Sequence, residues 1–135
     1  MRVWELAVED IVLPEDFGLD TTEKQLVNWF AKEKVPSKAW RSDPIAQFRV
    51  WGRGFDLLVK TESEDWIVEA KSKSSDGEVY KALGQLLFYK YLWETHGEKG
   101  NRGLKLICLG PSECSEDAKK FLTQYNIEFV KGELA

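Results

Sequence analysis

Three charged side chains interrupt two apolar runs in the segment "GFDLLVKTESEDWIVEAK", residues 54–71. Asp56 opens the first run, and Glu69 and Lys71 close the second. Ionisable groups within apolar strands cost free energy unless they are paired or bind a metal. Two carboxylates can hold a hard cation such as Mg²⁺, and an adjacent lysine can position or help deprotonate a water aimed at a phosphodiester. The alternative is an ion pair on the solvent face of a sheet.

The two runs are typical of an antiparallel hairpin that turns at residues 61–65. Side chains alternate between the faces of a strand, so Glu69 and Lys71 share one face and Ala70 points to the other. Counting back from the turn places Asp56 opposite about Ala70, to within one residue. The hairpin therefore predicts that two carboxylates and an ammonium group meet at one place.

A second group of polar residues has helical spacing. Gln85 and Tyr89 stand four residues apart and share a helix face, with Lys81 one turn earlier. Taken alone, this spacing is also typical of the polar edge of an amphipathic helix, with Tyr89 half buried over an apolar core.

The elements that would position these residues alternate between helix and strand. We expect helices over 20–34, 75–94 and 115–125, and strands over 46–51, 55–60, 65–71, 103–110 and 127–130. Three consecutive strands followed by alternating helices and strands indicate an α/β fold, with a mixed central sheet flanked by helices on both faces. Residues 1–20 form an N-terminal arm, and Pro36 and Pro44 bracket a loop.

Composition limits the function classes. The chain has 135 residues, 43% of them hydrophobic and 31% charged, which is the balance of one soluble globular domain. A net charge of −4 gives no strong overall attraction for nucleic acid, so a nucleic-acid binder would need local basic patches. Two cysteines are too few for a disulfide framework or a four-ligand zinc site. With no signal-like or membrane-spanning segment, we expect a cytoplasmic protein without membrane partners.

In this order and on these elements, Asp56, Glu69-x-Lys71 and Gln85-x-x-x-Tyr89 resemble the motifs of the PD-(D/E)XK nuclease superfamily, most closely its RecB-type and NucS-like members. The resemblance implies a restriction-endonuclease-like αβββαβ core over residues 21–110. The helix and strand within 111–135 would be a C-terminal addition. One departure is Phe55, which stands where many members have a proline.

The resemblance also implies roles for the matching residues. Asp56, Glu69 and the backbone carbonyl of Ala70 would bind Mg²⁺, with Mn²⁺ as a substitute. Lys71 would orient and activate the attacking water and stabilise the charge that develops on the phosphate.

Three further residues would act around that centre. Gln85 and Tyr89 would support the site or contact the nucleic-acid backbone. Glu23 stands on the first helix, where such enzymes often place another catalytic glutamate. Glu23 is also the third residue after Asp20, a position at which helix capping alone favours glutamate.

Four basic residues are candidates for nucleic-acid contacts: Arg49, Arg53, Lys73 and Lys81. Arg53 lies between two glycines and is the strongest of them. Residues 49–90 contain seven basic and seven acidic residues, so the region becomes favourable to phosphate only when a cation neutralises the carboxylates. The alternative for each of the four is an ordinary solvated charge.

Together these features predict a Mg²⁺-dependent nuclease that hydrolyses phosphodiester bonds in nucleic acid, DNA more than RNA, as an endonuclease. Repair, recombination, restriction and mobile-element processing all remain open. A core of this size would dimerise or use a partner protein to hold a duplex. The competing interpretation is a non-catalytic nuclease-fold module for nucleic-acid binding or assembly, because fold alone does not give function. The acidic net charge and six tryptophans favour that module, whereas the joint presence of Asp, Glu and Lys favours the enzyme.

Overall fold

The computed structural model describes residues 21–34, 45–50, 53–60, 63–96 and 103–133. The predicted N-terminal arm and the loop between Pro36 and Pro44 lie outside these ranges. The helices are α1 (Thr21–Glu33), α2 (Asp76–His96) and α3 (Glu116–Gln124); the strands are β1 (Ile45–Val50), β2 (Arg53–Lys60), β3 (Glu64–Ala70), β4 (Gly103–Gly110) and β5 (Ile127–Lys131). Every predicted helix and strand is present within two residues of its expected bounds.

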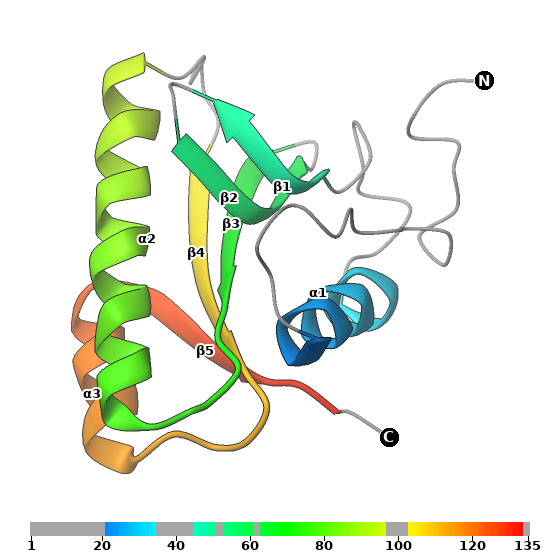
Figure 1. Ribbon diagram of the computed structural model, residues 1–135. Coiled ribbons are helices and arrows are strands. Elements are labelled where there is room, and N and C mark those ends of the chain that lie inside the picture. The colour runs from blue at the N-terminus through cyan, green and yellow to red at the C-terminus, as the bar shows by residue number, and fades with distance from the viewer. Residues whose placement is uncertain (1–20, 35–44, 51–52, 61–62, 97–102, 134–135) are drawn as a thin grey trace.

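The five strands form one mixed sheet in the order β1-β2-β3-β4-β5. β1, β2 and β3 form an antiparallel meander, whereas β4 pairs parallel to β3, and β5 pairs parallel to β4. The parallel pairings follow from the helical connections α2 and α3, which return the chain to the same end of the sheet (Figure 1). The predicted α/β fold with a restriction-endonuclease-like core is confirmed.

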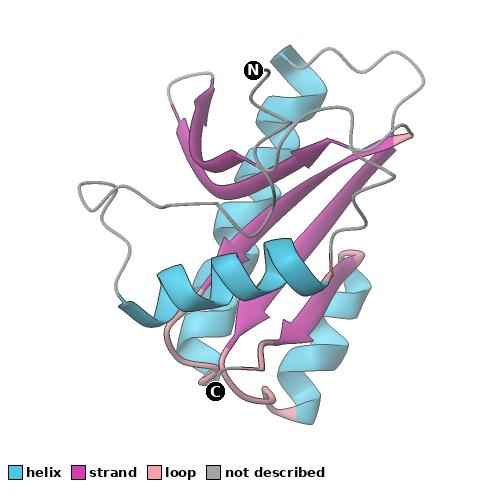
Figure 2. Cartoon of the chain, turned by 90° about the vertical axis from the view of Figure 1, so that its right-hand side faces the viewer, coloured by secondary structure: helices cyan, strands magenta, loops and turns pink. Residues whose placement is uncertain are grey.

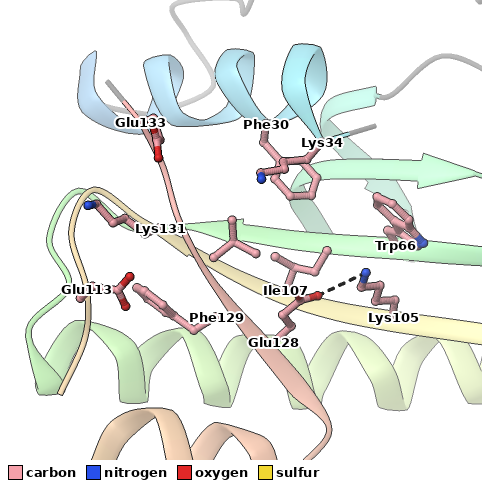
Figure 3. A pocket seen from close by; sticks show the side chains of 11 residues that line it. Phe30, Lys34, Trp66, Lys105, Ile107, Glu113, Glu128, Phe129, Lys131 and Glu133 are labelled. Carbon is pink, nitrogen blue, oxygen red and sulfur yellow. Dashed lines mark ion pairs between the residues drawn. The ribbon is translucent and has the colours of Figure 1, made fainter. Parts of the chain in front are cut away.

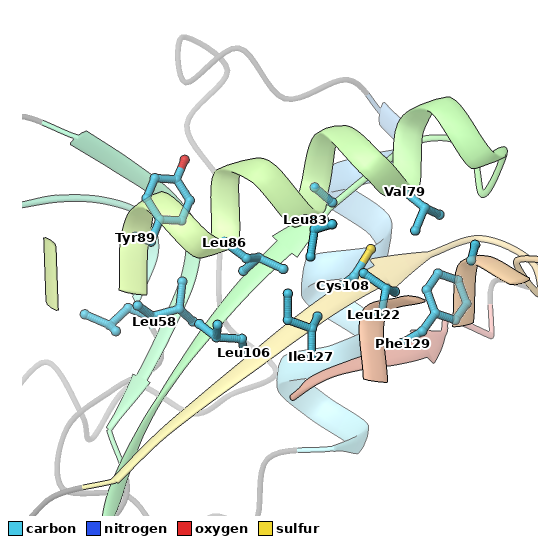
Figure 4. Close-up of a cluster of buried hydrophobic side chains, with 13 residues drawn as sticks. Leu58, Val79, Leu83, Leu86, Tyr89, Leu106, Cys108, Leu122, Ile127 and Phe129 are labelled. Atoms are coloured by element: carbon cyan, nitrogen blue, oxygen red, sulfur yellow. The ribbon is translucent and has the colours of Figure 1, made fainter. Parts of the chain in front are cut away.

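Helices cover the sheet on both faces. α2 and α3 lie on one face, and α1 crosses the other (Figures 1 and 2). Each face has its own apolar cluster, as the alternation of strand side chains requires. The α2 side buries, among others, Leu58, Ile67, Leu86, Cys108 and Leu122 (Figure 4). The α1 side buries, among others, Leu26, Phe30, Val68, Ala70 and Ile107.

The amino ends of α2 and α3 are joined by side-chain hydrogen bonds. Ser115 caps α3, since its Oγ accepts a hydrogen bond from the Ala118 backbone N–H at 3.0 Å. The same hydroxyl donates to Asp76 Oδ1 at 2.7 Å. This contact holds the first turn of α3 beside the first turn of α2. None of the helices in the described ranges combines the length and apolar character needed to cross a membrane.

A buried hydrogen bond anchors the carboxyl-terminal part of α2 to the sheet. Trp93 Nε1 donates to Asp65 Oδ2 at 3.0 Å, and both residues are buried. Hydrogen bonds to buried carboxylates are among the stronger ones in proteins. This bond fixes how far α2 is shifted along β3, and so which helical turn lies beside the end of that strand.

Replacing Trp93 by phenylalanine is expected to lower the free energy of unfolding by about 2 kcal/mol, because the bond is lost while most of the apolar contact stays. Lys81→Ala is the matched control on the same helix. It removes an exposed ion pair to Glu78 of 3.4 Å and should change stability by no more than about 0.5 kcal/mol. Urea unfolding followed by circular dichroism measures both variants; equal losses would show that the bond does not anchor α2.

Candidate functional site

The candidate site begins with a cross-strand pair of carboxylates. Leu57 of β2 pairs with Val68 of β3, and continuing this register by one residue places Asp56 opposite Glu69. The prediction that Asp56 lies opposite Ala70, to within one residue, is confirmed: the partner is Glu69, because pairing resumes at Asp65, nearer to the turn than expected. The two carboxylates share a face, since residues directly opposite each other in an antiparallel pair project from the same face of the sheet.

Backbone contacts hold this pair in place. The Ala70 N–H donates to Asp56 Oδ2 at 2.9 Å, so Asp56 is fixed against the peptide group that follows Glu69. The Lys71 N–H donates to the Leu109 carbonyl at 2.9 Å, which extends the contact between β3 and β4 by one residue. The end of β3 is thus restrained on both of its edges.

Lys71 completes the group. Its Nζ lies 3.9 Å from Glu69 Oε2, and its side chain is only 12% exposed. Asp56 and Glu69 are each 5% exposed. The structure therefore brings together the two carboxylates and the ammonium group that the hairpin pattern predicted, at a buried position near the end of the sheet.

Burial raises the pKa of Glu69 to about 10, and the negative charge of Asp56 and a hydrogen bond with its side chain contribute in the same direction. Lys71 opposes the shift but, at 3.9 Å, does not offset the burial. Without a cation, the pair therefore keeps one proton at neutral pH. Glu23, in the first turn of α1, also raises the pKa of Glu69, but its contribution is the smallest of these.

The oxygen atoms at this position suit a hard cation. Glu69 Oε1 is buried and accepts no hydrogen bond from the described residues. A buried carboxylate oxygen without a donor is costly unless a cation or ordered water meets it. In the described part of the chain, no group of three or more His, Cys, Asp or Glu side chains is arranged to hold a metal ion. A cation would therefore bind two carboxylates, the Ala70 carbonyl and waters, a set that Mg²⁺ accepts.

α2 brings Gln85 towards the same level of the sheet. From Asp65 to Glu69, β3 advances about 13 Å, which corresponds to about nine residues of helix. Counting back nine residues from Trp93, the partner of Asp65, reaches the turn that contains Gln85. The Oε1 atom of Gln85 is buried and has no hydrogen-bond partner within the described ranges. Gln85 therefore presents an unsatisfied amide oxygen beside the sheet.

The other predicted residues lie in different environments. Tyr89 is buried over Leu58 on the sheet side of α2 (Figure 4). The Lys81 side chain is 70% exposed and pairs with Glu78, and Lys73 is exposed in the connection between β3 and α2. Arg49 and Arg53 belong to β1 and β2, but their side chains lie outside the described part of the structure.

One residue beside the pair was not predicted from the sequence. Cys108 of β4 pairs with Glu69 in the parallel register, and burial raises the pKa of its thiol to about 12. Cys108 is therefore a neutral side chain that contributes to the apolar surroundings of Glu69. Strand alternation could predict that Cys108 is buried, but the β3–β4 register that makes it a neighbour depends on the length and position of α2.

A pocket of about 450 Å³ lies on the other side of the molecule, between α1 and the strands β4 and β5 (Figure 3). Three lysines and three glutamates take part in its lining, and Lys105 and Glu128 form an ion pair of 3.2 Å there. None of the candidate residues lines this pocket. We therefore place the candidate site at the carboxylate pair and Lys71, and not at the pocket.

No protein-family profile matches the sequence, and no curated protein matches it. Among solved structures, the chain is similar to a repair endonuclease from Pyrococcus abyssi, with a TM-score of 0.58 and 24% identity over 85% of this chain. It is also similar to EndoMS in its apo form, with a TM-score of 0.45 and 24% identity over 68% of this chain. The chain spans about half the length of the Pyrococcus endonuclease, 48% of it. The protein thus has the fold of a PD-(D/E)XK nuclease.

Proposed function

We propose that the protein is a Mg²⁺-dependent phosphodiesterase that cleaves nucleic acid, DNA in preference to RNA, as an endonuclease. The observation that supports this proposal best is the buried group of Asp56, Glu69 and Lys71 on a nuclease fold. A scaffold gains nothing from two adjacent carboxylates that keep a proton in the absence of a cation, whereas a cation site requires them. The repair endonuclease from Pyrococcus abyssi supports the same class of reaction by its fold.

Each residue has a distinct part in the proposed reaction. A bound divalent cation would supply positive charge to the phosphate and lower the pKa of a coordinated water. Asp56, held by the Ala70 N–H at 2.9 Å, and Glu69 would fix the cation next to the Ala70 carbonyl. The Lys71 ammonium group would orient the attacking water and stabilise the negative charge that develops on the phosphate. Cleavage of the P–O3′ bond leaves 5′-phosphate and 3′-hydroxyl ends.

Residues around this centre would hold the substrate. Gln85 would donate or accept a hydrogen bond at the site. Tyr89, buried on the sheet side of α2, would support the helix that carries Gln85. Glu23 would add negative charge on the side of α1. Contacts to the phosphate backbone would come from Arg49, Arg53, Lys73 and Lys81, so binding should weaken steeply as salt rises. A duplex substrate would be held by a homodimer or with a partner protein, and the two free thiols fit a reducing cytoplasm.

The raised pKa of Glu69 makes cation binding dependent on pH. Because the metal must displace the proton shared by the pair, the Mn²⁺ affinity of the protein should rise by up to about tenfold per pH unit between about pH 6 and pH 9. Above the pKa of about 10 the dependence should end. Titration calorimetry across this range measures it. An affinity that is constant over the range would show that Glu69 is not a ligand.

The proposed activity is tested by incubating the protein with linear, branched and single-stranded DNA and RNA in the presence of Mg²⁺ or Mn²⁺. Cleavage that EDTA abolishes, and that Asp56→Asn loses, would support the proposal and identify the substrate. Lys105→Ala is a suitable control, since Lys105 lies in the pocket between α1 and β4. If the wild type cuts nothing but binds Mn²⁺ through Asp56, a partner or substrate is missing. If it neither cuts nor binds Mn²⁺, the proposal is wrong.

A non-catalytic assembly module remains the second candidate. The observation that favours it is an aromatic surface on α2 and α3, where five large rings are more than a third exposed. A protein–protein contact at this surface is compatible with either function, because α2 turns its opposite face to the sheet (Figure 1). Mn²⁺ binding by the wild-type protein would favour the nuclease, whereas no Mn²⁺ binding would favour the assembly module.

A further inference from the structure

The outer face of α2 and α3 presents five exposed aromatic rings, here called the aromatic surface. Its members are Tyr80, Phe88 and Tyr91 of α2, Phe121 of α3, and Tyr125, the residue that caps the carboxyl end of α3. Their exposed fractions run from 38% for Phe121 to 59% for Tyr91. With about 200 Å² for each whole ring side chain, the exposed area is about 450 Å². This is as large as the largest apolar patch of a typical monomer, which is commonly functional.

The rings already pack against one another across the two helices. The Tyr80 and Phe121 centroids lie 5.6 Å apart with planes at 63°, and those of Phe121 and Tyr125 lie 5.5 Å apart at 52°. Phe88 and Tyr91 of α2 are stacked, with centroids 6.4 Å apart and planes at 26°. The rings thus form two packed groups, one that joins α2 to α3 and one on α2. Two of the three ring pairs meet at 52° or more and offer no parallel platform for successive bases, which favours a protein partner over single-stranded nucleic acid.

Two glycines lie in the same helical stripe as the rings. Positions 77, 80, 84, 88 and 91 follow spacings of three and four residues, so they share one face of α2. Gly77 and Gly84 are exposed, and a Cβ atom on either would meet no other atom within 4 Å. A glycine inside an exposed helix costs about 1 kcal/mol relative to alanine. A close approach of another backbone or ring to the helix would explain why glycine stands at these two positions.

The face of α2 that carries these five positions is complementary to the same face of a second α2 helix that runs antiparallel to it. With a two-fold axis at Gly84, residues whose numbers are equally distant from 84 come level with each other. Phe88 of each chain then lies level with Tyr80 of the other, and Tyr91 lies level with Gly77. Large rings meet either a ring or the space above a glycine, and the two Gly84 backbones meet at the axis. A two-fold interface requires this kind of self-complementarity.

We propose that a second copy of this chain covers the aromatic surface, with the two α2 helices packed antiparallel about Gly84. The exposed ring area of about 450 Å² supplies more than half of the roughly 800 Å² per partner that a stable interface buries. The flanking turns of α2 and α3 supply the rest. The dimer uses the face of α2 that points away from the sheet (Figure 1), whereas the carboxylate pair lies on the strands β2 and β3. The dimer does not depend on whether the protein cleaves nucleic acid.

Cross-linking tests the geometry directly. In a Cys114→Ser background, Gly84→Cys places a thiol at the proposed axis, where both copies of the residue meet. A Cβ at position 84 has room, so the variant should fold. Mild oxidation should convert most of it to a disulfide-linked dimer. Lys119→Cys, exposed on α3, is the matched control and should remain monomeric on denaturing gels. Equal cross-linking of the two variants would overturn the proposed axis.

Sedimentation equilibrium tests the surface itself. The wild type should be a dimer at about 50 µM, and the double variant Phe88→Asp/Tyr91→Asp should be a monomer, with at least about a hundredfold weaker association. Both residues are exposed, so circular dichroism should show an unchanged fold. A wild type that stays monomeric, or a variant that still dimerises, would overturn the proposal. Binding of an oligothymidine to a monomeric wild type, lost in the variant, would assign the surface to nucleic acid instead.

Discussion

Replacing Lys71 by alanine is expected to lower the cleavage rate by at least about 10²-fold, because an ammonium group aimed at the developing phosphate charge acts mainly in the transition state. Lys71 Nζ lies 3.9 Å from Glu69 Oε2, and an ammonium group has no acceptor atom with which to bind a cation. The Mn²⁺ affinity of the variant should therefore stay within about threefold of the wild-type value or increase slightly. Single-turnover cleavage and calorimetry on the same preparation measure the two quantities.

Lys120→Ala is the control for this experiment, since Lys120 is exposed on α3 and contributes to neither the carboxylate pair nor the proposed backbone contacts. It should cleave at the wild-type rate. A Lys71→Ala protein that is equally active would contradict the proposed role of the ammonium group. A variant that loses Mn²⁺ binding as well would show that Lys71 shapes the cation site and does not act on the phosphate alone.

Replacing Glu69 by glutamine should have two opposite effects. Mn²⁺ affinity should fall by at least about a hundredfold, because an anionic oxygen ligand is lost. The metal-free protein should become more stable by about 1–3 kcal/mol at about pH 8, because glutamine has the shape of the protonated acid and never needs to ionise in a buried position. Calorimetry and chemical unfolding in EDTA measure the two effects.

The sign of the stability change follows from the pKa of Glu69. In the unfolded chain this carboxyl ionises near its ordinary pKa of about 4.3, whereas in the folded protein its pKa is about 10. Between these values the folded state holds one more proton, so the contribution of Glu69 to stability falls as pH rises. The advantage of Glu69→Gln should therefore be small near pH 4 and grow towards pH 9. Glu128→Gln, which alters a half-exposed carboxylate, should show no such trend.

The order of elements could be predicted from the sequence because each has a strong local signal. The alternation in "DWIVEAK" and the apolar run "GLKLICLG" identified β3 and β4 to within one residue. The resemblance of the spaced Asp, Glu-x-Lys and Gln-x-x-x-Tyr motifs indicated that these elements form an αβββαβ core, but the strand order β1-β2-β3-β4-β5 came from the structure. Lys71 and Glu69 were correctly placed together because strand alternation alone decides which side chains share a face.

The remaining features depended on contacts between distant residues. The hairpin register could be predicted only to within one residue because it is set at the turn, where Lys60 pairs with Asp65. The sequence of α2 placed Tyr89 over an apolar core, but it did not show that Trp93 faces the sheet while Phe88 and Tyr91 face outward. That choice is made by the hydrogen bond between Trp93 and Asp65, which joins residues 28 apart in the chain.

The most direct test of the central claim, a cation site formed by Asp56 and Glu69, is calorimetric titration of the metal-free protein with Mn²⁺ at about pH 8 in two buffers of different ionisation enthalpy. The account predicts one site per chain, release of about one proton on binding, and at least about a hundredfold weaker binding in Asp56→Asn. Mn²⁺ binding that releases no proton and is unchanged in Asp56→Asn, or no binding at all by the wild type, would contradict it.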